Sequence, residues 1–330
     1  MDTTSPSFAQ VVHDLSIVRP WVLRSVLTTG LFDRLAKEPH TSAELTEALN
    51  ADPTVFTEVL GYLAAIGYVE VLDGVITITE RGRTLAQLPK DLYELGSPML
   101  TFDRAASELG SAWKLGAPVA SRRKLAYWDE IALDPEACAT IGRYQPRTVY
   151  FDGEQLVSAI TNELGSATSS VLDLGGSNGA LARDLSSVHD GSIGVLDLPE
   201  MIPNAQQNLS DLSPERFAFH GGSFFDPVPE GYDIYVLNSI LYDYSDLQVA
   251  QLLSGIHDSL PVHAVLVVSE AVLAFPDPYT QAESTLMLTL NSGGRSRSAD
   301  AVTTAATATG FGQPRRIYSS EQRFTLVFDR

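Results

Sequence analysis

Hydrophobic residues follow a different period in the two parts of the chain. Between residues 8 and 37 they recur at helical spacing and form a wide apolar stripe. Further along they form short runs of strand length, at 171–174, 193–197, 217–220, 233–238 and 264–269, with helix-length segments between them. Two last runs, 316–319 and 323–328, predict a closing antiparallel hairpin. The pattern predicts a helical N-terminal part and an α/β part with a mainly parallel, doubly wound sheet.

Local signals divide the N-terminal part into helices followed by a hairpin. Thr41–Glu44 matches a capping box at the start of one helix. Asp52–Pro53 starts another helix, which ends near Gly67. The β-branched runs on either side of Asp73–Gly74 are typical of a two-stranded hairpin. This order predicts a winged helix, and we expect residues 1–105 to form that domain.

A winged helix often binds DNA, but the charge of this chain argues against that partner. Residues 55–68, which stand where a recognition helix would lie, contain no Lys or Arg. That helix therefore lacks donors for phosphates and guanines. The net charge of −19 also repels a phosphate backbone. We expect no nucleic-acid partner, and a non-catalytic ligand-sensing or regulatory protein built on a dimeric winged helix is the weakest functional hypothesis.

Composition indicates where in the cell the protein works and which disulfide or metal sites it lacks. No uninterrupted apolar run reaches the roughly 18 residues of a membrane span, and the N-terminus lacks the basic and apolar regions of a secretion signal. The single cysteine, Cys138, excludes an internal disulfide. No cluster of His, Cys and carboxylates has metal-ligand spacing. We expect a cytoplasmic protein with no metal site and no membrane partner.

The most informative motif is the stretch 171–182, Val-Leu-Asp-Leu-Gly-Gly-Ser-Asn-Gly-Ala-Leu-Ala. An apolar strand runs into a glycine-rich turn, and a helix begins at once. Glycines there let backbone N–H groups approach a ligand closely. The adjacent Gly175 and Gly176 do not fit the G-x-G-x-x-G dinucleotide fingerprint. A second apolar strand ends at Asp197, whose carboxylate can accept both hydroxyls of a ribose.

These motifs, together with four later ones, resemble one family over nearly the whole chain. The later motifs are 217–226, 232–246, 267–270 and 293–297. The family is the dimeric class I O-methyltransferases of natural-product pathways, which include caffeic acid and hydroxyindole O-methyltransferases. The resemblance implies S-adenosylmethionine (SAM) as cofactor, a small-molecule substrate and a homodimer formed through the winged helix. It also implies a SAM-binding domain at 151–330 and a helical connector at 106–150 that roofs the acceptor pocket.

The resemblance also implies the site residues. Those expected to bind the cofactor are Asp173, Gly175, Gly179, Asp197, Ser223, Phe224, Asn238, Asp243 and Tyr244. Tyr242 and Glu270 stand at catalytic positions, and Met287 and Asn291 at substrate-binding ones. The aromatic residues of the connector are Trp113, Tyr127, Trp128, Tyr144 and Tyr150, and the sequence does not say which of them line the pocket.

The chain departs from the family pattern at four positions. Tyr242 replaces the histidine that serves the family as general base, and Ser296 replaces a flanking glutamate. Ser223 stands where the family often has an aspartate. Ser177 replaces a glycine, which is tolerated if the position does not need a positive φ. A phenol, with an ordinary pKa near 10, is a poor base at pH 7.

The sequence therefore leaves two enzyme hypotheses. The leading one is a SAM-dependent methyltransferase acting on a small aromatic or enolisable secondary metabolite without the usual histidine base. The alternative keeps the fold and bound SAM or S-adenosylhomocysteine (SAH) but catalyses a non-methylating reaction, such as cyclisation, pericyclic rearrangement, decarboxylation or hydroxylation. The loss of both the histidine and the glutamate motivates the alternative, because a Tyr242 hydroxyl could donate a hydrogen bond to a developing oxyanion.

Overall fold

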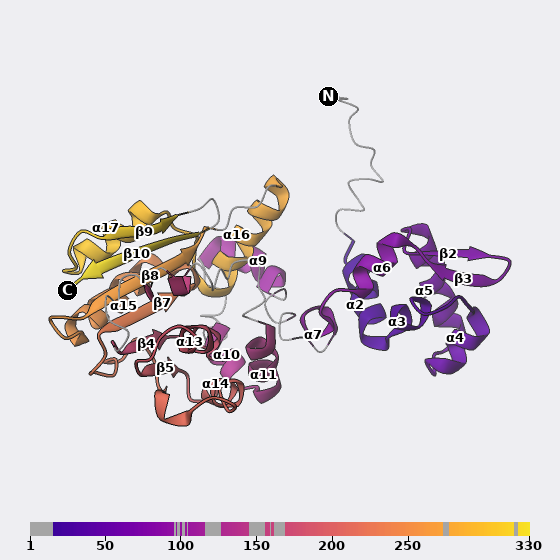
Figure 1. Cartoon of the computed structure of the whole chain (residues 1–330). Coiled ribbons are helices and arrows are strands. Elements are labelled where there is room, and N and C mark those ends of the chain that lie inside the picture. Colours follow the sequence, from indigo (N-terminus) through magenta and orange to yellow (C-terminus); the bar gives the residue numbers. More distant parts are fainter. Residues whose placement is uncertain are drawn as a thin grey trace. The chain divides into compact units, whose positions relative to one another are not determined.

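The computed structural model divides the chain into two compact units, residues 1–100 and 101–330, which are described separately (Figure 1). The structure describes residues 16–95, 97, 100, 103, 105–115, 127–144, 156–158, 160–161, 169–272, 277–319 and 323–330. None of the helices in these ranges is long and apolar enough to cross a membrane.

The first unit has the helix and hairpin order of a winged helix. Its elements are α2 (Val18–Thr29), α3 (Leu31–Leu35), β1 (His40–Thr41), α4 (Ser42–Ala48), α5 (Pro53–Ala65), β2 (Val69–Leu72), β3 (Val75–Ile78), α6 (Glu80–Ala86) and α7 (Lys90–Tyr93). The strands form an antiparallel sheet in the order β1-β3-β2. Both predicted caps are present: Thr41 and Glu44 form a capping box, and the Asp52 carboxylate accepts the first N–H groups of α5.

Two helices share the helical periodicity predicted over residues 8–37. Gly30 adopts φ 72°, and this left-handed residue ends α2 and precedes α3. The apolar stripe continues across the break because Val26, Leu31 and Phe32 are all buried in one core. The part of the prediction before residue 16 lies outside the described residues.

The second unit begins with short helices and continues into the α/β part. The first helices are η1 (Ala105–Glu108), α9 (Leu109–Leu115), α10 (Tyr127–Ala132) and α11 (Pro135–Tyr144). The strands are β4 (Val171–Leu174), β5 (Ile193–Asp197), β6 (Phe217–Gly221), β7 (Ile234–Asn238), β8 (Val265–Ala271), β9 (Arg315–Ser319) and β10 (Arg323–Asp329). The helices among them are α13 (Ala180–Ser186), α14 (Ile202–Asn208), η4 (Pro214–Arg216), η5 (Leu241–Asp243), α15 (Asp246–Ser259), α16 (Pro278–Ser292) and α17 (Ala299–Ala308).

The large sheet has the order β6-β5-β4-β7-β8-β10-β9. The first five strands in this order are parallel to one another, and β10 runs antiparallel to both β8 and β9. The predicted strands, the predicted closing hairpin and the doubly wound sheet are confirmed. β4 and β7 are neighbours; β5 lies next to β4 on one side, and β8 lies next to β7 on the other. The strand order therefore reverses between β4 and β7, and doubly wound folds bind ligands at such a point.

Alternate residues of the strands supply two separate cores, one on each face. On one face Leu172, Tyr235 and Leu237 pack against α15 and α17; on the other, Ile234 and Val236 pack against α13 and α14. Burying strands on both faces explains their nearly continuous apolar runs.

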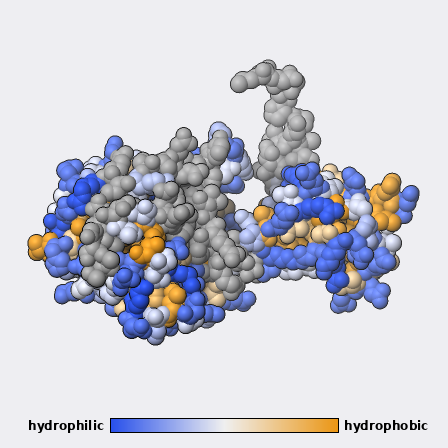
Figure 2. Space-filling view, viewed as in Figure 1, coloured by the Kyte–Doolittle hydropathy of each residue, from blue (hydrophilic) through white to orange (hydrophobic). Residues whose placement is uncertain are grey.

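Polar residues cover much of the visible surface of both units, with local apolar patches (Figure 2). One such patch lies at the end of the β2–β3 hairpin, where Val71 and Leu72 are 52% and 75% exposed.

Candidate functional site

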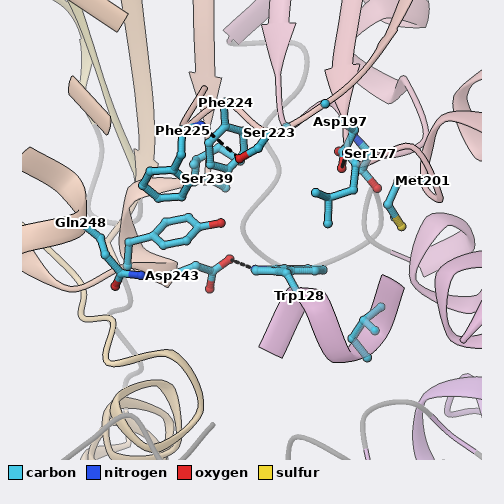
Figure 3. Close-up of a pocket in the computed structure, with 16 residues that line it drawn as sticks. Trp128, Ser177, Asp197, Met201, Ser223, Phe224, Phe225, Ser239, Asp243 and Gln248 are labelled. Atoms are coloured by element: carbon cyan, nitrogen blue, oxygen red, sulfur yellow. Dashed lines mark hydrogen bonds between the residues drawn. The ribbon is translucent and has the colours of Figure 1, made fainter. Parts of the chain in front are cut away.

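A cavity of about 340 Å³ opens where the parallel strands β4, β5, β6 and β7 end (Figure 3). Ligands of doubly wound sheets bind at this edge. Sixteen described residues line it: Trp128, Ile131, Gly175, Ser177, Asp197, Leu198, Met201, Gly222, Ser223, Phe224, Phe225, Ser239, Ile240, Asp243, Tyr244 and Gln248.

The loop after β4 forms one wall and depends on left-handed backbone. The φ angles of Gly175, Ser177 and Gly179 are 76°, 50° and 71°. A Cβ atom at Gly175 would lie 2.5 Å from Cδ1 of Ile240, so a larger residue does not fit there. From the sequence, a serine at position 177 is expected to be tolerated only if φ is not positive there. The φ of Ser177 is positive, and this conformation costs about 1–2 kcal/mol for a non-glycine residue.

Asp197 lies at the end of β5 beside the glycine loop. Its Oδ2 accepts a hydrogen bond from the Ser177 N–H at 2.7 Å, and its Oδ1 accepts one from the Leu198 N–H at 2.7 Å. Burial raises the pKa of Asp197 to about 6, against the opposing effect of these two donors. Each carboxylate oxygen has a second lone pair, so Asp197 can still accept two ligand hydroxyls.

Three aromatic rings form an apolar wall on the other side of the cavity. The Tyr244 ring meets Phe224 at 5.9 Å and Phe225 at 5.1 Å between ring centroids, both edge to face. Ser223, which precedes them, accepts a hydrogen bond from the Phe225 N–H at 3.2 Å. This wall suits a flat ring system such as adenine.

Asp243 and Trp128 meet across the cavity from elements far apart in sequence (Figure 3). The indole Nε1 of Trp128 donates to Oδ2 of Asp243 at 3.2 Å. Asp243 is half-buried and lines the cavity. Burial raises the pKa of Asp243 to about 8; the Trp128 hydrogen bond lowers it, and the nearby Glu270 charge raises it further.

Glu270 lies beneath the loop that carries Asp243 and is 2% exposed. Its Oε1 accepts from the N–H groups of Ile240 at 2.9 Å and Leu241 at 2.8 Å, and its Oε2 accepts from the Tyr242 N–H at 3.2 Å. Burial raises the pKa of Glu270 to about 7, although these hydrogen bonds and the positive charge of Arg323 lower it. The carboxylate thus fixes the backbone of three consecutive residues.

The segment after α16 holds the same loop from its carbonyl side. Arg297, which is 7% exposed, donates to the Leu241 carbonyl at 2.6 Å and the Tyr244 carbonyl at 2.8 Å. A Cβ at Gly294 would lie 2.1 Å from the Tyr242 carbonyl oxygen, so a glycine is needed for this approach. The Gly-Gly-Arg-Ser-Arg motif of residues 293–297 therefore acts as a clamp on the loop.

The structure brings six of the predicted cofactor residues to the cavity surface: Gly175, Asp197, Ser223, Phe224, Asp243 and Tyr244. The other three lie beside it. Asp173 is buried under the glycine loop, since a Cβ at Gly176 would lie 2.6 Å from its Oδ2. Gly179 is the N-cap residue of α13, and Asn238 accepts a hydrogen bond from Arg323 at 2.9 Å. Their contact with a cofactor stays a prediction.

The predicted catalytic and substrate residues are not among those that line the cavity. Tyr242 is held through its backbone, as described above. Met287 packs beside the buried Leu290 of α16, and the Asn291 side chain donates to the Met287 carbonyl at 3.0 Å. The roles expected for these residues remain predictions.

Several residues of the site were not predicted from the sequence. Trp128 was one of five scattered aromatic residues, and nothing in its sequence context marked it. Met201 and Gln248 also line the cavity. Arg323, only 2% exposed, donates to Ser239 at 2.7 Å beneath the cavity. The sequence signal for Arg323 is its position as a lone charged residue at the start of the apolar strand 324–328.

The lining fits SAM in its chemistry. It offers a carboxylate for ribose, aromatic rings for adenine and an orphaned donor: the Ser177 hydroxyl is buried and has no hydrogen-bond partner among the described residues. A bound molecule can supply that partner. Within the described ranges, no group of three or more His, Cys, Asp and Glu residues could hold a metal ion.

Comparisons with known proteins identify the family. Residues 125–312 match the O-methyltransferase domain family. The chain is 30% identical over 291 residues to O-demethylpuromycin-O-methyltransferase of Streptomyces alboniger, covering 84% of this chain and 77% of that protein. It is 27% identical to 2,7-dihydroxy-5-methyl-1-naphthoate 7-O-methyltransferase of Streptomyces carzinostaticus, covering 86% of each.

A solved structure confirms the fold over nearly the whole chain. The crystal structure of an O-methyltransferase (NcsB1) from neocarzinostatin biosynthesis, in complex with SAH and 1,4-dihydroxy-2-naphthoic acid, has a TM-score of 0.83 at 24% identity and covers 98% of this chain and 99% of that one. The matching proteins are named as methyltransferases, so a non-methylating use of the fold is not favoured. The chain belongs to the O-methyltransferase family and is a SAM-dependent methyltransferase of small natural-product substrates.

Proposed function

We propose that this enzyme methylates an acidic hydroxyl of a small aromatic or enolisable metabolite, one that gives up its proton without a histidine base. The observation that carries the proposal is Tyr242, which occupies the loop position where the family resemblance places the base. None of the sixteen described lining residues is a histidine or a lysine either. An acceptor with a low pKa is already ionised at neutral pH and needs no such group.

Bound SAM supplies the methyl group as an electrophile at its sulfonium. The residues of this chain then have to hold the acceptor oxygen in line with that methyl group and keep water away, and alignment of this kind contributes several kcal/mol. The apolar wall of Phe224, Phe225 and Tyr244 supports water exclusion. We assign Glu270 to positioning of the loop, because both of its carboxylate oxygens bind backbone N–H groups.

A graded series of acceptors tests the proposal. We expect kcat/KM at pH 7, measured as SAH formation with phenols and hydroxynaphthoates of decreasing pKa, to rise steeply as the acceptor pKa falls toward 7. The matched control is Tyr242→His, in which a restored base should flatten this dependence. An equally flat dependence in the wild-type enzyme would show that another group removes the proton.

We further propose that the first unit mediates a homodimer and that the enzyme works in the cytoplasm. Exposed apolar residues at the start of the first unit support the dimer: Ile17, Val18 and Trp21 are 72%, 49% and 44% exposed. A wide apolar face of this kind is typical of an interface. The free, buried Cys138 suits a reducing compartment. The mass of the protein in solution, measured by light scattering, tests the dimer.

A further inference from the structure

Two carboxyl groups and no cationic side chain lie among the described residues that line the cavity. Asp197 and Asp243 both line it, and none of its sixteen described lining residues is Lys, Arg or His. The two carboxylates differ in what holds them. Asp197 accepts two backbone N–H groups at 2.7 Å each, whereas the one hydrogen bond found to the Asp243 carboxylate, among the described residues, comes from the Trp128 indole at 3.2 Å.

This difference leaves Asp243 poorly compensated. Burial raises the pKa of Asp243 to about 8 but that of Asp197 only to about 6. A carboxyl group in such a place is stabilised in its charged form by a cation placed beside it. The orphaned Ser177 hydroxyl in the same cavity independently indicates that a polar ligand completes the site.

The cofactor and its product differ by one positive charge. SAM carries a sulfonium, whereas SAH, formed when the methyl group leaves, has a neutral thioether at that sulfur. The ribose, the adenine and the ammonium and carboxylate of the amino-acid end are the same in both. We propose that the Asp243 carboxylate, held by Trp128, recognises the sulfonium charge and makes this site bind SAM in preference to SAH. The proposal rests on the assignment of this cavity to SAM.

The proton balance of binding follows from the groups around Asp243. Glu270 of β8 raises its pKa, Trp128 of α10 lowers it, Asp197 faces it across the cavity, and Arg297 binds carbonyls of its own loop. A pKa raised to about 8 means that the free enzyme holds a proton on Asp243 at pH 7. The sulfonium placed beside Asp243 favours the ionised form, so SAM expels that proton, whereas SAH, whose sulfur is neutral, leaves it bound.

Calorimetric titration of the full chain tests this with SAM, SAH and sinefungin, which has an amine where SAM has its sulfonium methyl. We expect the wild-type protein to bind SAM and sinefungin about tenfold more tightly than SAH, equivalent to about 1.4 kcal/mol. Asp243→Asn keeps the shape and an acceptor for Trp128, and should bring the ratio close to one. The exposed Glu215→Gln removes the same charge at a distance and should leave the ratio unchanged.

Two further measurements separate the possible failures. Asp197→Asn should weaken SAM and SAH equally, because both contain the ribose. If Asp197→Asn acts in this way and Asp243→Asn leaves the ratio unchanged, charge recognition by Asp243 is wrong and the cofactor site stands. If neither variant weakens any ligand, the site assignment fails as well. Should Asp243→Asn not fold, titration of the wild-type protein at pH 7 in buffers of different ionisation enthalpy decides: equal proton release with SAM and SAH overturns the proposal.

Discussion

The loops after β4 and β7 leave neighbouring strands of the sheet, yet their conformations are fixed in opposite ways. The loop after β4 is shaped by its own residues, through left-handed backbone at Gly175, Ser177 and Gly179. The loop after β7 is held largely by side chains from elsewhere, Glu270 on its N–H side and Arg297 on its carbonyl side. The first loop depends mainly on its own left-handed residues, with one N–H bound by Asp197, and the second depends mainly on side chains from other elements.

This difference explains how the side chain at position 242 can vary while the second loop keeps its place in the fold. Glu270 and Arg297 bind backbone atoms, and Gly294 leaves room for the Tyr242 carbonyl. None of these contacts involves the side chain at position 242. The contacts that hold the loop backbone are therefore independent of the side chain at position 242. That side chain, and the chemistry it provides, can change while the backbone contacts are kept.

The largest expected effect comes from removing the Glu270 carboxylate, which holds the backbone of the loop after β7. Glu270→Ala leaves three backbone N–H groups without their charged acceptor, and we expect the free energy of unfolding to fall by roughly 3 kcal/mol or more. Urea denaturation measures this loss. The exposed Glu215→Ala serves as control and should lie within about 0.5 kcal/mol of the wild-type protein. If Glu270→Ala lowers the free energy of unfolding by less than about 1 kcal/mol, the loop does not depend on its contacts with Glu270.

The next effect concerns the β4–β5 side of the cavity. Asp197→Ala removes the acceptor that we expect for two ribose hydroxyls, each hydrogen bond contributing about 1.5–3 kcal/mol. We expect the Kd for SAM to rise by about a hundredfold or more. Calorimetric titration measures it, with the exposed Asp226→Ala as control. Binding of SAM by Asp197→Ala at wild-type strength would remove the cofactor role assigned to this residue.

The same contrast explains what could be predicted from sequence. Glycines at 175 and 179, the capping box at Thr41 and the strand runs act over a few residues, so their structures were predicted correctly. Trp128 and Arg323 reach the site from distant segments, and no local pattern shows where they will meet Asp243 or Ser239. The break at Gly30 was missed because the apolar stripe continues through it.

Exchanging the side chain at position 242 tests whether this side chain affects turnover without affecting the loop backbone and SAM binding. Tyr242→Phe should leave the Kd for SAM within about twofold of wild type and change kcat, because only one hydroxyl is lost. Tyr242→His should raise kcat for weakly acidic phenols by about tenfold or more, since a positioned base contributes about 10²- to 10⁴-fold. Single-turnover kinetics separates these effects from product release. A large loss of SAM affinity in either variant would contradict the separation.

The smallest expected effect compares two serines in left-handed backbone, one from each loop. Ser177 has φ 50° and a hydroxyl without a partner among the described residues, whereas Ser239 has φ 59° and accepts a hydrogen bond from Arg323 at 2.7 Å. Glycine relieves about 1–2 kcal/mol of strain at either position and costs about 0.4–1 kcal/mol in chain entropy. Only Ser239→Gly also loses a hydrogen bond to a charged group, about 1.5–3 kcal/mol.

We therefore expect Ser177→Gly to raise the free energy of unfolding by up to about 1 kcal/mol and Ser239→Gly to lower it by a similar amount. Urea denaturation of the two variants, each without ligand, measures the difference. Because the backbone strain is nearly the same in both, the sign depends on whether the loop is shaped by its own residues or held by a distant one. Equal changes in the two variants would show that Arg323 contributes nothing to the second loop, and the contrast between the two loops would then hold only for Glu270 and Arg297.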